Sequence, residues 1–164
     1  MSMTLYGLFI GLVATAVIDV AAVVMKSGFG VATANWAMVG RWVGHLPRGR
    51  FVHPAIGAAA PVAGELSLGW ATHYAIGLLY GIGYLWIVIE AAGGSPSLAS
   101  AVAFSVVLLA APWLILQPGL GLGAFARRAP KPWMVRAVNV FMHVVFGAGL
   151  YLGWWLIAVS GLLG

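Results

Sequence analysis

Four long apolar segments occupy most of the chain, and the eight Lys and Arg residues lie between them or, for Arg136, at the very start of the fourth. The segments cover residues 4–25, 66–89, 98–116 and 135–159, about 20 residues each, which is the length of helix that crosses a bilayer. Hydrophobic residues make up 63% of the sequence and charged residues 7%, against roughly 45–50% and about 25% in soluble domains. The sequence therefore predicts an all-α, polytopic membrane protein: a four-transmembrane-helix bundle that forms a single domain over residues 1–164.

The basic residues predict how this bundle is oriented. Those that follow the first span are Lys26, Arg41, Arg48 and Arg50, and those that follow the third are Arg127, Arg128, Lys131 and Arg136. Because Lys and Arg resist translocation, we expect loops 26–64 and 117–134 to be cytoplasmic and both termini to be outside. Basic residues that flank apolar spans indicate anionic lipid headgroups, not nucleic acid, as partners. The chain has no cysteine, which excludes disulfides and thiolate metal sites.

Three ionisable side chains, Asp19, His73 and His143, lie inside the spans. Each shares a four-residue spacing with small residues such as Gly11 or Gly77, so each should face protein and not lipid. Counted from the nearest charge at the cytoplasmic end of its span, Asp19 and His143 lie about 10 Å deep and His73 about 12 Å deep. We therefore expect the three side chains to form one layer, in which Asp19 contacts at least one of the histidines.

This layer leaves three interpretations open. A His beside a carboxylate titrates near neutral pH, which suits a carrier or membrane enzyme that handles protons or a small molecule. Asp19, His73 and His143, with Glu65, would suit zinc or iron, although no compact ligand motif supports a metal. An Asp–His hydrogen bond would equally hold helices together in a structural or assembly subunit of a membrane complex.

We favour the first interpretation, with Asp19, Glu65, His73 and His143 as candidate catalytic residues. We expect no cofactor. Whether the protein is an enzyme, and whether it forms a homo-oligomer or joins a membrane complex, stays open at this point.

The first basic loop also carries a helical pattern. Apolar residues at positions 36–46 recur at helical spacing, which predicts a short interfacial helix that ends near Pro47. Glu65, at the start of the second span, can pair with Arg41 or Arg48 across this loop, either as a gate or as a staple.

Both basic loops are candidates for binding an anion. The second loop runs Gln117-Pro118-Gly119-Leu120-Gly121-Leu122-Gly123 before two arginines, and glycine-rich backbone beside arginines can cradle an anion. It is not a nucleotide-binding P-loop, because no Lys-Ser/Thr follows it. The alternatives are a plain positively charged anchor for the first loop and a re-entrant or interfacial turn for the second. The candidate anion- or substrate-binding residues are Arg41, His45, Arg48, Arg50, Gln117, Arg127 and Arg128.

A set of short motifs extends from the first basic loop to the last span. They are Gly40-Arg41-Trp42, Gly44-His45-Leu46-Pro47-Arg48-Gly49-Arg50-Phe51, Glu65-Leu66 with Gly69-Trp70 and His73-Tyr74, the run 116–123, and His143 with Phe146-Gly147 and Leu150-Tyr151. This set resembles a bacterial family of small integral membrane proteins catalogued as a domain of unknown function. The resemblance covers essentially the whole chain. It implies a four-helix protein of the bacterial cytoplasmic (inner) membrane and carries no catalytic role over to these positions.

Overall fold

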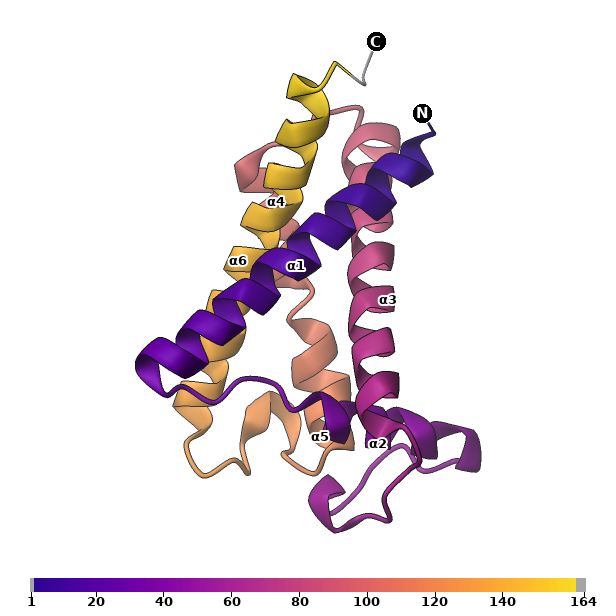
Figure 1. Ribbon diagram of the computed structural model, residues 1–164, viewed down its shortest axis with the longest axis vertical. Coiled ribbons are helices and arrows are strands. Elements are labelled where there is room, and N and C mark those ends of the chain that lie inside the picture. Colours follow the sequence, from indigo (N-terminus) through magenta and orange to yellow (C-terminus); the bar gives the residue numbers. More distant parts are fainter. Residues whose placement is uncertain (1, 162–164) are drawn as a thin grey trace. The chain divides into compact units, whose positions relative to one another are not determined.

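The computed structural model describes residues 2–161, and within that range it contains helices and no strand (Figure 1). Four helical stretches are long and apolar enough to cross a membrane: Met3–Phe29, Glu65–Ala91, Leu98–Gly119 and Pro132–Val159. They confirm the all-α class and the four spans. Each stretch is a few residues longer than expected at one or both ends.

Helix ends account for part of the added length. Helix α1 (Met3–Phe29) ends at Gly30, whose left-handed backbone, with φ 64°, only glycine adopts readily. Lys26 therefore lies in the last turn of α1 and not in the loop, where its charge meets the partial negative charge of the helix C-terminus. Helix α6 (Pro132–Val159) begins with a proline, which suits the first helical position because a donor there would have no helical partner. Arg136 accordingly lies on α6.

The remaining elements complete the spans and the loops between them. They are α2 (Trp36–His45), α3 (Glu65–Leu85), α4 (Leu98–Val107), α5 (Gln117–Gly119), π-helical stretches at Trp86–Ala91 and Pro112–Leu116, and 3₁₀ turns at Leu46–Arg48, Ile56–Ala58 and Ala124–Ala126. Helix α2 is the helix expected in the first loop. Asn35 caps it, because its side-chain oxygen accepts a hydrogen bond from the Met38 N–H at 3.3 Å. Its position at a membrane interface stays a prediction.

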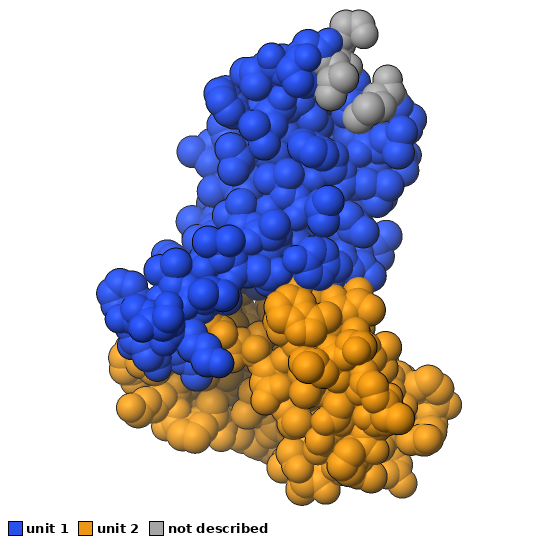
Figure 2. All heavy atoms as spheres, in the orientation of Figure 1, with its two compact units in different colours: residues 1–32, 74–107, 141–164 blue, residues 33–73, 108–140 orange. Residues whose placement is uncertain are grey.

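The chain forms two compact units, coloured separately in Figure 2. Unit 1 comprises residues 1–32, 74–107 and 141–164, and so takes in α1, α4 and the C-terminal parts of α3 and α6. Unit 2 comprises residues 33–73 and 108–140, with α2, α5 and the N-terminal parts of α3 and α6.

The core of unit 1 is built by all four long helices. Its buried apolar residues are Ile10, Ala14, Tyr84, Leu85, Ala101, Phe146, Leu150 and Ile157. The Tyr84 side chain is fully buried, and its hydroxyl forms a hydrogen bond of 2.8 Å with the Ser100 hydroxyl. A buried phenol needs such a partner. The bundle expected from the sequence is thus present within this unit.

Glycines bring α1 and α3 into backbone contact in unit 1. A Cβ placed on Gly7 would lie 2.6 Å from the Ile82 Cα, and one placed on Gly11 would collide with the carbonyl oxygen of Gly77. A Cβ on Gly81 would in turn lie 2.6 Å from the Gly11 nitrogen. Small residues at four-residue spacing allow this approach in membrane helices. Gly7, Gly11, Gly77 and Gly81 therefore form a filled seam between α1 and α3.

In unit 2 a second glycine pair joins α2 to the start of α3. A Cβ on Gly40 would lie 2.6 Å from the Gly69 nitrogen, and one on Gly69 would collide with the Trp36 carbonyl oxygen. Gly69 belongs to the same four-residue repeat as Gly77 and Gly81, but it contacts α2, whereas they contact α1. Its spacing thus indicated a close contact without indicating which helix makes it.

The loop after α2 pairs with the glycine-rich turn after α5. The His53 N–H donates to the Gly119 carbonyl at 3.0 Å, and the Ile56 N–H donates to the Leu120 carbonyl at 3.1 Å. The Trp42 indole N–H donates to the Phe51 carbonyl at 2.8 Å. The first two bonds join segments that are far apart in sequence, and the third holds the first loop against α2.

Candidate functional site

Arg41 of α2 and Glu65 of α3 form an ion pair in unit 2. The Nη2 of Arg41 donates to Glu65 Oε1 at 2.7 Å and its Nε donates to Oε2 at 2.8 Å, so the contact is bidentate. The two side chains are only 11% and 18% exposed. The hydrogen bonds to Glu65 raise the pKa of the Arg41 guanidinium above its ordinary value, against the opposing effect of its burial. The structure thus confirms that Glu65 pairs with Arg41, one of its two expected partners.

The same pair ties down the loop that precedes α3. Arg41 Nη1 donates to the carbonyl oxygens of Ala59, Gly57 and Ile56 at 3.1, 3.3 and 3.5 Å. Glu65 Oε2 also accepts the Val62 N–H at 3.1 Å. Most of the five N–H donors of the guanidinium are therefore used within the protein. These contacts support the staple interpretation of the pair and leave little of Arg41 for an external anion.

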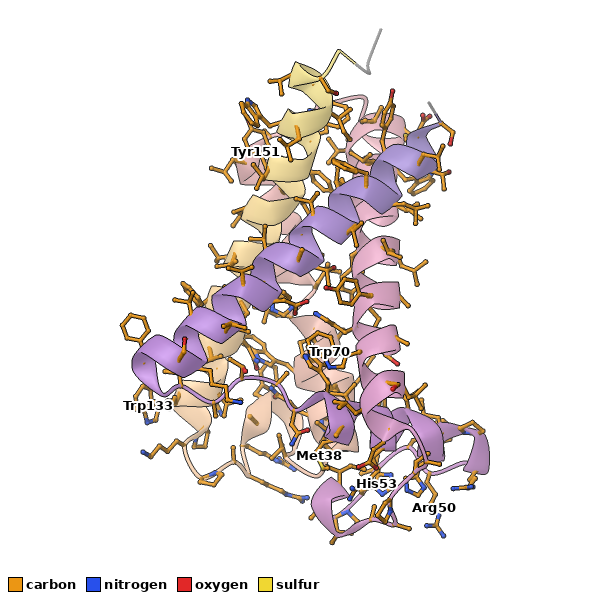
Figure 3. All side chains as sticks on the ribbon, viewed as in Figure 1. Met38, Arg50, His53, Trp70, Trp133 and Tyr151 are labelled. Atoms are coloured by element: carbon orange, nitrogen blue, oxygen red, sulfur yellow. The ribbon has the colours of Figure 1, made fainter. Side chains whose placement is uncertain are left out.

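Two buried histidines lie side by side near this pair. His45, at the end of α2, is 1% exposed, and His53, labelled in Figure 3, is 6% exposed. Their ring centroids are 5.1 Å apart, with 57° between the ring planes. His45 Nε2 lies 3.0 Å from the Ala60 carbonyl oxygen, which can only accept, so Nε2 carries the proton. Within residues 2–161, His45 Nδ1 and His53 Nε2 are buried without a hydrogen-bond partner.

Gln117 belongs to a separate polar cluster in unit 2. Its Nε2 donates to Asn139 Oδ1 at 2.7 Å, and Trp113 Nε1 donates to the same oxygen at 3.2 Å. Gln117 is 5% exposed, and its Oε1 has no hydrogen-bond partner among the described residues. Buried polar atoms of this kind are uncommon in proteins and mark positions where a further donor would bind favourably.

The remaining candidates for anion binding are at the surface. Arg48, Arg50, Arg127 and Arg128 are exposed. Arg127 and Arg136 line an open hollow of about 510 Å³ together with Ala124 and Phe125. Arg136 Nε donates to the Phe125 carbonyl at 2.7 Å, which fixes the guanidinium beside the hollow. Phe125 and Ala126 adopt left-handed backbone, with φ of 55° and 53°, a strained conformation that is enriched at functional sites.

In unit 1, Asp19 of α1 contacts α3. The Tyr74 hydroxyl donates to Asp19 Oδ2 at 2.8 Å, and both side chains are half-buried. A carboxylate within an apolar span is costly, and a hydrogen bond from a phenol lowers that cost. Asp19 thus faces protein, as its small-residue stripe predicted.

The two histidines of the expected layer lie in different units. His143, on α6 in unit 1, accepts a 2.6 Å hydrogen bond at its carbonyl oxygen from the Ser105 hydroxyl of α4. His73, in unit 2, is 8% exposed, and its ring stacks on Trp36 with centroids 4.0 Å apart. The Trp70 ring meets His73 edge-on at 5.7 Å. The convergence of His73 and His143 with Asp19 stays a prediction.

Within residues 2–161, no group of three or more His, Cys, Asp or Glu side chains is placed to hold a metal ion. The metal considered at Asp19, His73 and His143 gains no support from this geometry and stays an untested alternative.

Comparison with known proteins places the chain in a family. The family model described as "Protein of unknown function (DUF2938)" matches residues 8–157. The chain belongs to this family. Its membership confirms the resemblance to a family of unknown function that the motifs indicated. No curated protein and no solved structure matched the chain. All candidate residues of this DUF2938 protein lie inside the matched range.

Among the residues of these clusters, sequence reasoning did not connect Tyr74 with Asp19 or Asn139 with Gln117. Tyr74 follows His73, and only the contact between α1 and α3 shows that it reaches Asp19. A Cβ on Gly77 would collide with Thr15 Oγ1, so these two residues face each other. Asp19 lies one turn after Thr15 on α1, and Tyr74 lies about one turn before Gly77 on the antiparallel α3, so they meet in the same way. Asn139 lies four residues before His143 on the same stripe, and that spacing was a usable signal.

Proposed function

We propose that this DUF2938 protein is a multi-pass protein of the bacterial cytoplasmic membrane that handles protons or a small solute through Asp19, His73 and His143. Both termini lie outside, and loops 26–64 and 117–134 face the cytoplasm, where their basic residues meet anionic lipid headgroups. The four apolar helices and the placement of the eight Lys and Arg residues support this arrangement.

The hydrogen bond from Tyr74 to Asp19 carries the proposal. An ionised carboxylate only accepts hydrogen bonds, and the Tyr74 hydroxyl donates one to it. When Asp19 is protonated, its O–H can donate a hydrogen bond to the acceptor nitrogen of an imidazole. The proton can then pass from Asp19 to the histidine. Ionisable groups inside membrane spans are rare, and they mark substrate or ion pathways and proton relays.

Two nearly isosteric variants separate proton handling from packing. Asp19→Asn keeps an oxygen that accepts the Tyr74 hydroxyl but cannot exchange a proton, whereas Tyr74→Phe removes the hydrogen bond and keeps the carboxylate. Each variant is reconstituted in vesicles with a trapped pH dye, and proton flux is measured after a pH step. We expect Asp19→Asn to lower the flux by about tenfold or more, and Tyr74→Phe to lower it by about threefold at most.

The opposite pattern would refute the proposal. If Asp19→Asn conducts like the wild type while Tyr74→Phe loses thermal stability, the hydrogen bond serves packing. Equal, background-level flux for the wild type and for empty vesicles would also contradict proton handling.

A structural or assembly subunit is the second candidate function. The filled seam at Gly7, Gly11 and Gly81 favours it, because backbone contact there leaves no room for a solute between α1 and α3. In that case His73→Ala and His143→Ala should leave the cellular phenotype intact, and a partner should co-purify with the wild type and with both variants.

A further inference from the structure

The buried histidines His45 and His53 each have a ring nitrogen that takes no part in packing contacts or in the proposed proton handling. The proton of His45 is fixed on Nε2 by the Ala60 carbonyl, so in the neutral ring Nδ1 carries a lone pair. That lone pair is buried and unpartnered among residues 2–161, as is His53 Nε2. Leaving a buried polar atom without a partner is unfavourable, so each of these two nitrogens is open to a ligand.

The separation of the two rings matches a tetrahedral metal ion. With Zn–N distances of about 2.0–2.1 Å and a tetrahedral angle, the centroids of two imidazoles on one zinc lie about 5 Å apart. The centroids of His45 and His53 are 5.1 Å apart. A linear two-coordinate ion would hold them about 6 Å apart or more with the same bond lengths.

The outer contacts of His45 also fit a metal ligand. Histidines that bind metals usually donate their other ring N–H to a carbonyl or carboxylate, which fixes the tautomer and the ring orientation. The contact of His45 Nε2 with the Ala60 carbonyl, at 3.0 Å, is of that kind. We propose that His45 and His53 together bind a transition-metal ion, with zinc the best match, and that water completes its coordination.

The charges around the two rings allow a cation. Arg41 lies one turn before His45 on α2, but its charge is matched by the bidentate contact with Glu65. Its remaining Nη1 donors point to the backbone carbonyls of residues 56, 57 and 59. Arg48 and Arg50 are exposed to solvent, which screens them. A bound ion would join the end of α2 to the loop that carries His53.

The site can be tested on the full-length protein without an affinity tag. The protein is stripped with a chelator in detergent micelles and titrated with Co²⁺, whose visible absorption reports tetrahedral coordination, and then with competing Zn²⁺. We expect a single Co²⁺ per chain, displaced by Zn²⁺, and a rise in the melting temperature with Zn²⁺. His45→Gln and His53→Gln should each weaken binding by about tenfold or more, whereas His143→Gln should change it by about twofold or less.

Several results would overturn this proposal. One is the absence of binding below about 100 µM Co²⁺; another is unchanged binding in both His45→Gln and His53→Gln. Loss of the metal in His143→Gln alone would place it at the Asp19 layer instead. If a variant fails to fold, X-ray absorption of the zinc-loaded wild type decides: two imidazole nitrogens support the site, and an all-oxygen shell contradicts it. None of these outcomes depends on proton flux through Asp19.

Discussion

Within residues 2–161, the polar contacts of Arg41 with Glu65 and with backbone carbonyls of the following loop explain why its side chain is buried. A guanidinium presents a planar fork of donors, and in this protein the fork meets a carboxylate on one edge and three backbone carbonyls on the other. Arginine and lysine are therefore not equivalent at this position, although both keep the charge. Together with Glu65, Arg41 holds the backbone of the loop at residues 56–62 in place.

Replacing Arg41 by lysine tests this role. Arg41→Lys keeps the charge next to Glu65 but loses the bidentate contact and the bonds to the loop carbonyls. We expect amide hydrogen exchange at residues 56–62 to become faster on the order of tenfold. Arg48→Lys, at an exposed arginine of the same loop, is the matched control and should leave exchange unchanged. Equal exchange in both variants would show that the loop holds its shape without the fork.

At the scale of elements, the seam between α1 and α3 depends on the absence of side chains. Without a hydrophobic driving force between helices in lipid, close packing and hydrogen bonds must supply the association. Gly11 and Gly77 bring the two backbones into contact, and Thr15 satisfies its own hydroxyl by donating to the Gly11 carbonyl at 2.7 Å. Any added Cβ must push the helices apart.

Two Gly→Ala substitutions on α1 should differ in their effect on stability. Gly11→Ala places its methyl group against the Gly77 carbonyl and should destabilise the fold by about 1–3 kcal/mol. A Cβ on Gly28 of α1 would meet no atom within 4 Å, so Gly28→Ala should be neutral or stabilising by up to about 1 kcal/mol, through helix propensity. Thermal denaturation in micelles measures both. Equal stability of Gly11→Ala and the wild type would mean that the helices move apart at no cost.

The sequence predicted elements better than contacts, for a physical reason. Hydropathy and helical spacing are local, so the four spans and α2 were found, with errors at their ends, for example where the cap at Gly30 or the starting proline of α6 sets the boundary. The glycine stripes predicted close packing but assigned Gly69 to no particular helix. The adjacency of His45 and His53 depends on how residues 46–64 fold back on the turn at 119–121, and no periodic pattern encodes that path.

For the whole molecule, the orientation is open to a direct test, because the chain has no cysteine of its own. Single cysteines are introduced at Arg48, Arg128 and Ser95, and cells are treated with a maleimide that does not cross the cytoplasmic membrane. We expect Ser95→Cys to be labelled in intact cells, and Arg48→Cys and Arg128→Cys only after the membrane is opened. Labelling of the two basic-loop cysteines in intact cells would invert the proposed topology.

We propose that Asp19 works together with His143 and His73, and a double-mutant cycle separates such coupling from independent action. Unfolding free energies are measured in micelles for Asp19→Asn, His143→Gln, His73→Gln and the two doubles that contain Asp19→Asn. We expect at least one double to cost less than the sum of its singles, with a coupling of about 0.5–3 kcal/mol. Additive effects in both cycles, within about 0.5 kcal/mol, would show that the three side chains act independently and would contradict the shared layer.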